Sequence, residues 1–414
     1  MRASAIVLAG FVLTWSRGHG PHRRSEAMTS TFRYVAGATF CALLLILGRA
    51  PSLAMPNFAQ AYGVQCSTCH TAVPTLNAYG RYVQRSQYAY LSPLVLKKAV
   101  PVWLDYQATY DSQAGAPDTH RVIWGNLAVH LDGLIGDNWS YHVQQWLVSD
   151  NQGGPLDTAW VSFNNLFKHN GYLEVGKLEV PAPSPFSQWF EISPFATPEV
   201  TVGEHTYELD ANRWGAKMGY LNNSLSLAAA YVGSDADLNG ATDFVPPAGK
   251  TLQYQAAFMR PKNPLEFGVY GASGTFPISD GLTDHFSAFA GYLQRDPTNG
   301  VPGVFFVYQT THDSYPMAGA TGPANGRDYT LNIYEPIIKD RVVIGFRREM
   351  TDDGMGNVTH YGNIDLTIQL ARFLRLYTEA GLSGSNPGNG VNRIGTPAWR
   401  AFIWWTMPIA RPKS

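Results

Sequence analysis

The strongest constraint on the fold is an alternation of apolar and polar residues that begins near residue 101 and continues almost to the end of the chain. In one such segment, Ile364, Leu366 and Ile368 alternate with polar neighbours. Successive side chains of a strand point to opposite faces, so this period of two is typical of a half-buried strand. The pattern predicts roughly sixteen strands, most of them close to the length of about 9–11 residues that a tilted membrane-spanning strand needs. They cover residues 102–112, 121–134, 138–150, 158–166, 171–179, 212–221, 224–233, 251–260, 265–274, 284–295, 303–311, 328–338, 341–351, 359–370, 373–382 and 399–409.

The links between these strands largely alternate between short and long. A β-sandwich gives no reason for such alternation, but a membrane barrel does, because its short turns face the periplasm and its long loops face outside. An even number of strands also returns both chain ends to the periplasm. Two links fit less well, since 296–302 is long for its position and 352–357 is short. The tight turns are 135–137, 222–223, 339–340 and 371–372, and the long links are 180–211, 234–250, 312–327 and 383–398.

Composition agrees with either a membrane barrel or a soluble β protein. Aromatic residues make up 13% and charged residues 15% of the 414 residues, and Gly (40) and Pro (27) are abundant. No stretch after residue 55 approaches the roughly 20 apolar residues of a membrane-spanning helix. The formal charge of −1 argues against nucleic acid as a partner.

A barrel of roughly sixteen strands encloses an aqueous lumen rather than a filled core. We therefore expect charged residues of the strands to face lumen water or the N-terminal segment, and several tryptophans to form a girdle at the membrane interface. The inward-facing candidates are Arg341, Arg347, Arg375, Glu266, Asp365 and Glu379. The girdle candidates are Trp139, Trp146, Trp189, Trp399, Trp404 and Trp405.

Residues 1–54 read as an upstream extension followed by a signal peptide. The apolar run 34–48 follows Arg33, and small residues stand at the −3 and −1 positions before a cleavage site after Ala54. Cleavage there makes Met55 the new N-terminus and removes Cys41, one of the three cysteines. Because a signal rarely begins so far into a chain, we expect translation to start at Met28.

The motif Cys66-Ser67-Thr68-Cys69-His70 is the attachment pattern of a c-type haem. Two thiols at this spacing can add to the two vinyl groups of one porphyrin, and the adjacent imidazole then becomes the proximal ligand of the iron. The sequence thus predicts one haem c, with thioether bonds at Cys66 and Cys69 and His70 on the iron.

Three other interpretations of the motif remain open at this point. A redox dithiol would use the two thiols alone and would leave His70 unexplained. A structural zinc needs about four ligands, and no second cysteine pair accompanies the motif. A plain structural disulfide suits an exported protein.

Residues 55–98 form the predicted haem segment, a small α-helical module ahead of a barrel that occupies residues 99–414. A helix is expected from Pro74 to Gln84, with Leu76, Tyr79 and Val83 on the face that packs against the porphyrin. No Met or second His lies between His70 and Pro101, so the distal ligand is open. The candidates are Met55, His120, His130, His142, His205, Met218 and Met259.

Three runs accompany the motif: Pro56-Asn57-Phe58-Ala59 and Tyr62-Gly63-Val64 before it, and Pro74-x-Leu76-Asn77-Ala78-Tyr79-Gly80 after it. With these runs, the haem segment resembles that of the fused monohaem cytochrome–porins of bacterial outer membranes, a family that includes outer-membrane iron oxidases. The match is close in this segment and extends to the rest of the chain in architecture only. The resemblance implies a cytochrome threaded into a barrel, with Cys66, Cys69 and His70 as its haem-binding residues.

The leading hypothesis is a mainly β protein, a roughly 16-stranded antiparallel outer-membrane β-barrel with a small N-terminal α-helical c-type haem segment that enters from the periplasm. It would transfer electrons from an extracellular donor to a periplasmic carrier such as a soluble cytochrome, with outer-membrane lipid around the barrel. Fe(II) is one candidate donor, which would make the chain an Fe(II):cytochrome c oxidoreductase. The alternatives are a solute porin with a haem-bearing N-terminal plug, and a soluble periplasmic cytochrome fused to a β-sandwich.

Overall fold

The computed structural model describes most of one compact unit, Ala50–Ser414. The predicted signal peptide and start site, Cys41 and Met55 lie outside the described residues, as do His120 and Trp189. The described residues are 56–96, 100–113, 121–149, 152–168, 170–188, 192–233, 250–298, 300–371, 373–387, 393–394 and 398–409.

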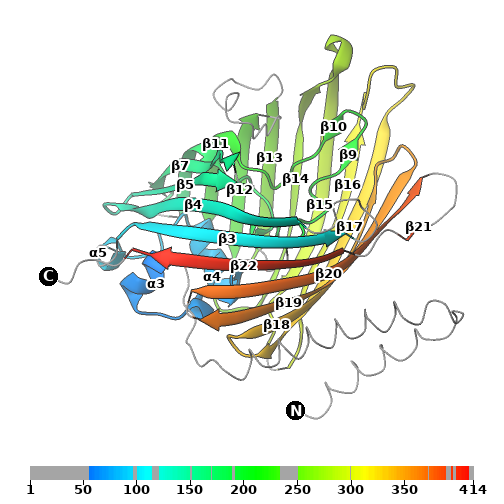
Figure 1. The fold of residues 1–414 in the computed structure, drawn as a ribbon. Helices are drawn as coiled ribbons and strands as arrows, with labels where there is room; N and C mark the ends of the chain where they lie inside the picture. The colour runs from blue at the N-terminus through cyan, green and yellow to red at the C-terminus, as the bar shows by residue number, and fades with distance from the viewer. Residues whose placement is uncertain are drawn as a thin grey trace, which may run out of the picture. The chain divides into compact units, whose positions relative to one another are not determined.

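Sixteen long antiparallel strands form a closed barrel (Figure 1), together with two-residue pieces β6 (Gln152–Gly153) and β21 (Arg393–Ile394). Each strand pairs with its neighbours in sequence, and β22 closes the ring against β3, with Phe402 opposite Thr109. The long strands are β3 (Val102–Gln113), β4 (Arg121–Ile135), β5 (Trp139–Ser149), β7 (Leu156–Leu166), β8 (Gly171–Leu178), β11 (Arg213–Leu221), β12 (Leu225–Gly233), β13 (Lys250–Phe258), β14 (Leu265–Pro277), β15 (Thr283–Arg295), β16 (Gly303–Asp313), β17 (Ala324–Ile338), β18 (Val342–Asp352), β19 (Asn357–Ala371), β20 (Leu374–Pro387) and β22 (Ala398–Pro408).

All sixteen predicted strands are confirmed, most of them with ends within two residues of the prediction. The larger differences are at β14, which ends at Pro277 rather than 274, at β17, which begins at Ala324 rather than 328, and at β20, which ends at Pro387 rather than 382. The closed ring makes the β-sandwich alternative wrong. No helix among the described residues is long and apolar enough to cross a membrane.

The two faces of the barrel differ in polarity in the sense expected of a membrane barrel. On β19, Ile364 is exposed on the outer face while Asp365 is buried on the inner one. The same inversion holds on β18 for Phe346 and Arg347. An outer surface of exposed apolar side chains is suited to a hydrocarbon environment.

Links of different length collect at opposite ends of the barrel. Residues 136–138, 222–224 and 339–341 are tight turns at one end, and Gly136 and Asp340 both adopt the left-handed conformation there, with φ of 64° and 60°. The long links 179–212 and 314–323 lie at the other end. The N-terminal helices share the end with the short turns, where β22 finishes (Figure 1).

The tryptophans predicted to form a girdle differ in exposure. Trp139, Trp399 and Trp405 are exposed on the outer face. Trp404 is instead an inward residue, because it alternates with Trp405 along β22, and its ring lies 5.5 Å from the guanidinium carbon of Arg375. Trp146 is half-buried.

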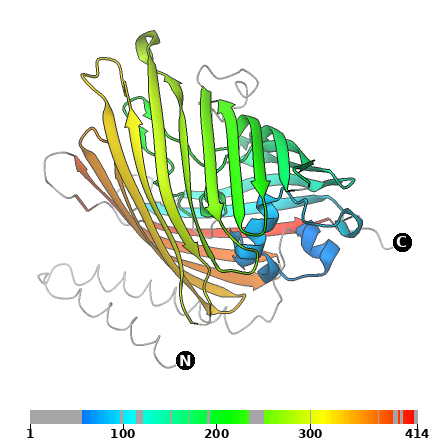
Figure 2. The ribbon, with the colours of Figure 1, turned by 180° about the vertical axis from the view of Figure 1, so that it is seen from behind.

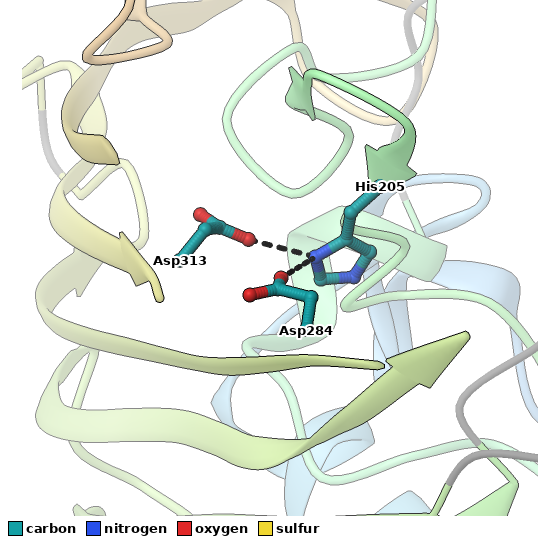
Figure 3. A group of neighbouring side chains, drawn as sticks. All are labelled: His205, Asp284 and Asp313. Carbon is teal, nitrogen blue, oxygen red and sulfur yellow. Dashed lines mark hydrogen bonds and ion pairs between the residues drawn. The ribbon is translucent and has the colours of Figure 1, made fainter. Parts of the chain in front are cut away.

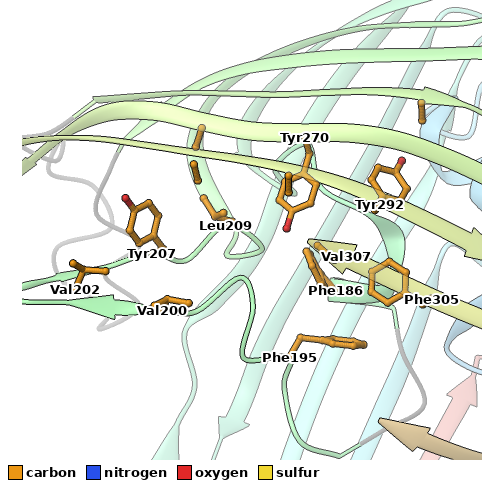
Figure 4. Close-up of a cluster of buried hydrophobic side chains, with 14 of the residues drawn as sticks. Phe186, Phe195, Val200, Val202, Tyr207, Leu209, Tyr270, Tyr292, Phe305 and Val307 are labelled. Carbon is orange, nitrogen blue, oxygen red and sulfur yellow. The ribbon is translucent and has the colours of Figure 1, made fainter. Parts of the chain in front are cut away.

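Much of the lumen is filled by the chain itself, whereas strand number alone predicted an aqueous lumen rather than a filled core. The link 179–212 folds inward and contains α6 (Ser184–Ser187), β9 (Thr201–Val202) and β10 (His205–Thr206). Its apolar side chains pack against the inner faces of β14, β15 and β16 (Figure 4). The link contributes Phe186, Phe195, Val200, Val202, Tyr207 and Leu209, and the wall contributes Tyr270, Tyr292, Phe305 and Val307 among others.

The N-terminal segment contains α3 (Pro56–Tyr62), η2 (Cys66–Thr68), β1 (His70–Ala72), β2 (Thr75–Leu76), α4 (Ala78–Arg85) and α5 (Pro93–Leu96). The helix predicted from Pro74 begins only at Ala78, because β2 pairs with β1 and delays it. Asn77 then caps the helix, and its Oδ1 accepts a hydrogen bond from the Gly80 N–H at 3.0 Å.

Buried ion pairs hold this segment to one side of the lumen (Figure 2, helices in blue). Arg81 bonds Glu266 at 2.8 Å and Asp296 at 2.7 Å, and Arg85 bonds Glu266 at 2.6 Å. On another side, Phe58 and Tyr88 belong to an apolar cluster that includes Trp160 of β7.

Five of the six charged residues predicted to face inward do so, and several of them contact the two segments that fill the lumen; the sixth, Arg341, lies in the turn before β18. Glu266 binds the N-terminal segment, as above, and Glu379 accepts hydrogen bonds from the N–H groups of Ile192 and Ser193 at 3.1 and 2.9 Å. Arg347, Asp365 and Arg375 are buried on inner faces, and Arg341 is half-buried.

Candidate functional site

The Cys-x-x-Cys-His motif is built onto the first turn of α4. The Asn77 N–H donates to the Cys69 carbonyl at 2.9 Å, and the Asn77 side-chain amide donates to the carbonyls of Ser67 and Thr68, both at 3.2 Å. A Cβ atom at Gly80 would collide with the Cys69 carbonyl oxygen. A residue without a side chain is therefore required at Gly80 for the helix to approach the motif.

Neither motif cysteine forms a disulfide, and the two lie in one small cluster in which Cys66 is buried and Cys69 half-buried. Burial, together with the neighbouring Cys66, raises the pKa of Cys69 to about 11. Reactive redox thiols need a lowered pKa, so this environment disfavours the dithiol interpretation. Among the described residues, the motif is not part of any group of three metal-ligating atoms within 4.8 Å of one another, which disfavours zinc.

His70 is buried and oriented by the chain immediately after it. Its Nδ1 donates a hydrogen bond to the Pro74 carbonyl at 2.8 Å, which leaves Nε2 as the nitrogen that can bind a metal. Burial lowers the pKa of His70 to about 4, with the Pro74 carbonyl opposing and Arg375 adding to this shift. The imidazole is therefore neutral at neutral pH, as a metal ligand must be.

A cavity of about 460 Å³ lies between the N-terminal segment and the barrel wall. Cys69 and His70 line it, as do Leu76, Tyr79 and Val83, the three residues expected to form one apolar face. The volume and the mainly apolar lining are those of a site for a small-molecule cofactor.

The barrel strands contribute two histidines to the lining of this cavity, each bonded to a carboxylate. His142 on β5 bonds Asp132 through Nδ1, and His130 on β4 bonds Asp105 through Nε2 at 3.1 Å. Trp103 on β3 joins the two pairs. Its Nε1 donates to Asp132 at 2.6 Å, and its ring stacks on His130 at 3.6 Å between centroids.

Sequence reasoning missed Trp103, Asp105 and Asp132. Their inward positions followed from strand alternation, since Trp103 and Asp105 are two residues apart on β3 and His130 and Asp132 are two apart on β4. Their pairing depends on the register, in which Trp103 is opposite His130.

The remaining distal-ligand candidates lie elsewhere. Met218 is exposed on the outer face of β11. Met259 is buried, and its sulfur accepts a hydrogen bond from Arg85 at 3.0 Å. Met55 and His120 are outside the described residues.

His205 belongs to a separate buried cluster near the long loops (Figure 3). Its Nδ1 lies 2.9 Å from Asp313 and 3.6 Å from Asp284, and Tyr207 donates to Asp313 at 2.9 Å. Asp284 is the second residue of β15 and Asp313 the last of β16, so both lie at the end of the barrel opposite to Asp296, which binds Arg81. The cluster thus fastens the inward-folded link to the wall.

The barrel is closed and antiparallel, with sixteen strands, buried charged residues on its inner face and exposed apolar residues on its outer face. This is the architecture of outer-membrane porins. No protein-family model matches this chain, and no curated protein matches it in sequence.

Solved structures share the fold at low sequence identity. The anion-selective porin of Comamonas acidovorans superposes with a TM-score of 0.54 at 12% identity, over 74% of this chain and 98% of the porin. The outer-membrane protein OmpT of Vibrio cholerae, with its loop L8 deleted, gives 0.53 at 10% identity over 74% and 98%. The chain therefore has a porin-like barrel fold.

Proposed function

We propose that this chain is an outer-membrane c-type cytochrome fused to a porin-like barrel, and that it passes electrons from an extracellular donor to a periplasmic carrier. The observation that carries the proposal is the orientation of His70. Its Nδ1 is held by the Pro74 carbonyl, and its ring lines the same 460 Å³ cavity as Cys69. A proximal histidine with a fixed tautomer beside an apolar cavity meets the requirements of a haem site.

The residues present fit one haem c. Cys66 and Cys69 would form the two thioether bonds, and His70 Nε2 would bind the iron. Leu76, Tyr79 and Val83 would pack against the porphyrin and exclude water from one face. When bound, haem c supplies a one-electron couple.

The position of the motif supports a periplasmic acceptor. His70 and Thr71 lie against Asp340 and Arg341, in the turn between β17 and β18 at the end with short links. That end faces the periplasm in outer-membrane barrels. An electron leaving the motif would have a short path to a periplasmic carrier, whereas an extracellular donor would have to enter from the end with long loops.

Fe(II) is the donor we propose to test first, since its oxidation needs contact near the haem edge but no elaborate substrate pocket. The parent protein, matured with a cytochrome c assembly system, should show a c-type spectrum that Fe(II) reduces. The Cys69→Ala variant is the control and should lose normal attachment. A parent protein whose haem stays oxidised in the presence of Fe(II) would exclude Fe(II) as the donor, but it would not contradict electron transfer from another extracellular donor.

The porin-like fold favours a second candidate function, a solute porin in which the N-terminal segment acts as a plug. The Comamonas acidovorans relative in fold is described as anion-selective. The two functions differ in conductance, because a porin needs an open path through the lumen.

A further inference from the structure

We infer that His142, on the barrel wall, is the second axial ligand of the iron, facing His70 across the cavity. This inference rests on the proposed haem site. It adds that the barrel itself completes the coordination shell, so that the haem environment is shared between the N-terminal segment and strand β5.

The first argument is location. His142 and His70 line the same cavity, although they are 72 positions apart in the sequence. His70 comes from the N-terminal segment and His142 from an inner face of the barrel. Two imidazoles on different walls of one apolar cavity can approach a planar cofactor from its two sides.

The second argument is orientation. His142 bonds Asp132 through Nδ1, which leaves its Nε2 as the nitrogen that can bind iron. His70 is arranged in the same way, because its Nδ1 bonds the Pro74 carbonyl. Asp132 is itself fixed, because Trp103 Nε1 donates to its other carboxylate oxygen at 2.6 Å. Metal-bound histidines usually donate their second N–H to a carboxylate or carbonyl in this way.

The third argument is the position of the ring. His142 stacks on Trp160 at 5.8 Å between centroids, and Trp160 in turn contacts Tyr88 of the N-terminal segment at 5.8 Å. The orientation of the imidazole is therefore coupled to docking of the segment that carries the motif.

His130 also lines the cavity but is unsuited to the role. Its Nε2 is engaged by Asp105 at 3.1 Å, its Nδ1 is fully buried without a hydrogen-bond partner among the described residues, and Trp103 covers one face of its ring. One ring nitrogen is therefore occupied by a carboxylate, and the other has no surface open to the cavity. His130 is therefore the matched control for His142.

Spin state tests the inference without relying on activity. The oxidised parent should be six-coordinate and low-spin, with the electron paramagnetic resonance pattern of two histidine ligands. His142→Ala should convert the haem to a high-spin form, and added imidazole should restore the low-spin form. His142→Met should give the charge-transfer absorption of a sulfur ligand and a higher reduction potential. His130→Ala should keep the parental spectrum.

The possible outcomes separate the assignment of His142 as a ligand from the proposal that the chain carries a covalent haem. A parent without covalent haem would overturn the proposed function. Covalent haem whose low-spin spectrum survives His142→Ala, or a parent that is already high-spin, would overturn only the assignment of His142. Heat-modifiable gel mobility shows that each variant has folded, and His142→Met preserves side-chain bulk if the alanine variant does not fold.

Discussion

At the scale of single residues, the N-terminal segment depends on a few buried polar contacts. Arg81 is 1% exposed and Glu266 is fully buried, and the ion pair between them joins α4 to β14. Asp296 forms a second ion pair with Arg81 and also accepts a hydrogen bond from the Ala78 N–H at 2.8 Å. If Arg81 were removed, Asp296 would be left buried without its cation, and Glu266 would keep only its ion pair with Arg85.

We therefore expect Arg81→Met to destabilise docking of the segment by about 3–5 kcal/mol, the usual cost of removing one partner from a buried ion pair. Hydrogen exchange of residues 78–85 measures the effect. The matched control is Arg327→Met, because Arg327 pairs with Asp352 at 3.3 Å but is 66% exposed and should lose less than about 1 kcal/mol. Equal effects of the two substitutions would contradict the docking role of Arg81.

Gly80 supplies a second prediction at this scale. Gly→Ala within a helix ordinarily stabilises it by roughly 0.5–1 kcal/mol. At Gly80 the sign should reverse, because the new methyl group meets the Cys69 carbonyl. Covalent haem per folded protein should fall in Gly80→Ala and stay at the parental level in Gly291→Ala, where no atom lies within 4 Å of the added carbon. Full attachment in Gly80→Ala would refute the close approach.

At the scale of elements, the local sequence pattern predicted the positions of the barrel strands well, but it did not predict the contacts between residues of different elements. The strands near 363–370 and 265–274 could be located because alternation is a property of each segment alone. The start of α4 could not, because Pro74 is a good first residue of a helix, yet the pairing of His70 with Leu76 overrides that preference. Cys66, Cys69 and His70 lie within five residues, so their pattern can be read from the sequence. The contact between His142 and Asp132 depends on the register between β4 and β5, which the sequence pattern does not give.

The inward link 179–212 gives a pH prediction. Burial alone would lower the pKa of His205, but Asp284 and Asp313 outweigh burial and raise it. A histidine whose pKa rises on folding stabilises the fold fully below its unfolded pKa of about 6.5. This stabilisation is lost as the pH rises through the higher folded pKa.

The melting temperature, followed by heat-modifiable gel mobility, should therefore fall in the parent as the pH is raised from about 6 to 9. His205→Gln should flatten this dependence. His312→Gln is the control, because the His312 side chain is exposed on β16 and bonds the neutral side chain of Asn325 at 2.8 Å. A parental slope that persists in His205→Gln would show that other groups are responsible.

At the scale of the whole molecule, a porin-like barrel is occupied by two of its own segments. The N-terminal segment contacts Glu266 of β14, Trp160 of β7 and Tyr377 of β20, which lie on different sides of the ring. The link 179–212 fills the region beside β14, β15 and β16. Strand number predicts the width of the barrel but not its contents, because the packing of these segments depends on contacts between residues far apart in sequence.

Conductance in planar bilayers should accordingly be low for the parent. Arg81→Met should open the lumen more often, since it weakens the contact between α4 and β14. Arg327→Met again serves as the control. Large, steady currents through the parent would favour the solute-porin function instead.

The central claim is that Cys66 and Cys69 attach one haem inside this barrel, and intact mass measured on denatured protein tests it most directly. After expression with a cytochrome c assembly system, the parent should carry the mass of one haem through denaturation, and the double variant Cys66→Ala, Cys69→Ala should carry none. A folded parent whose mass is that of the bare polypeptide would contradict the account.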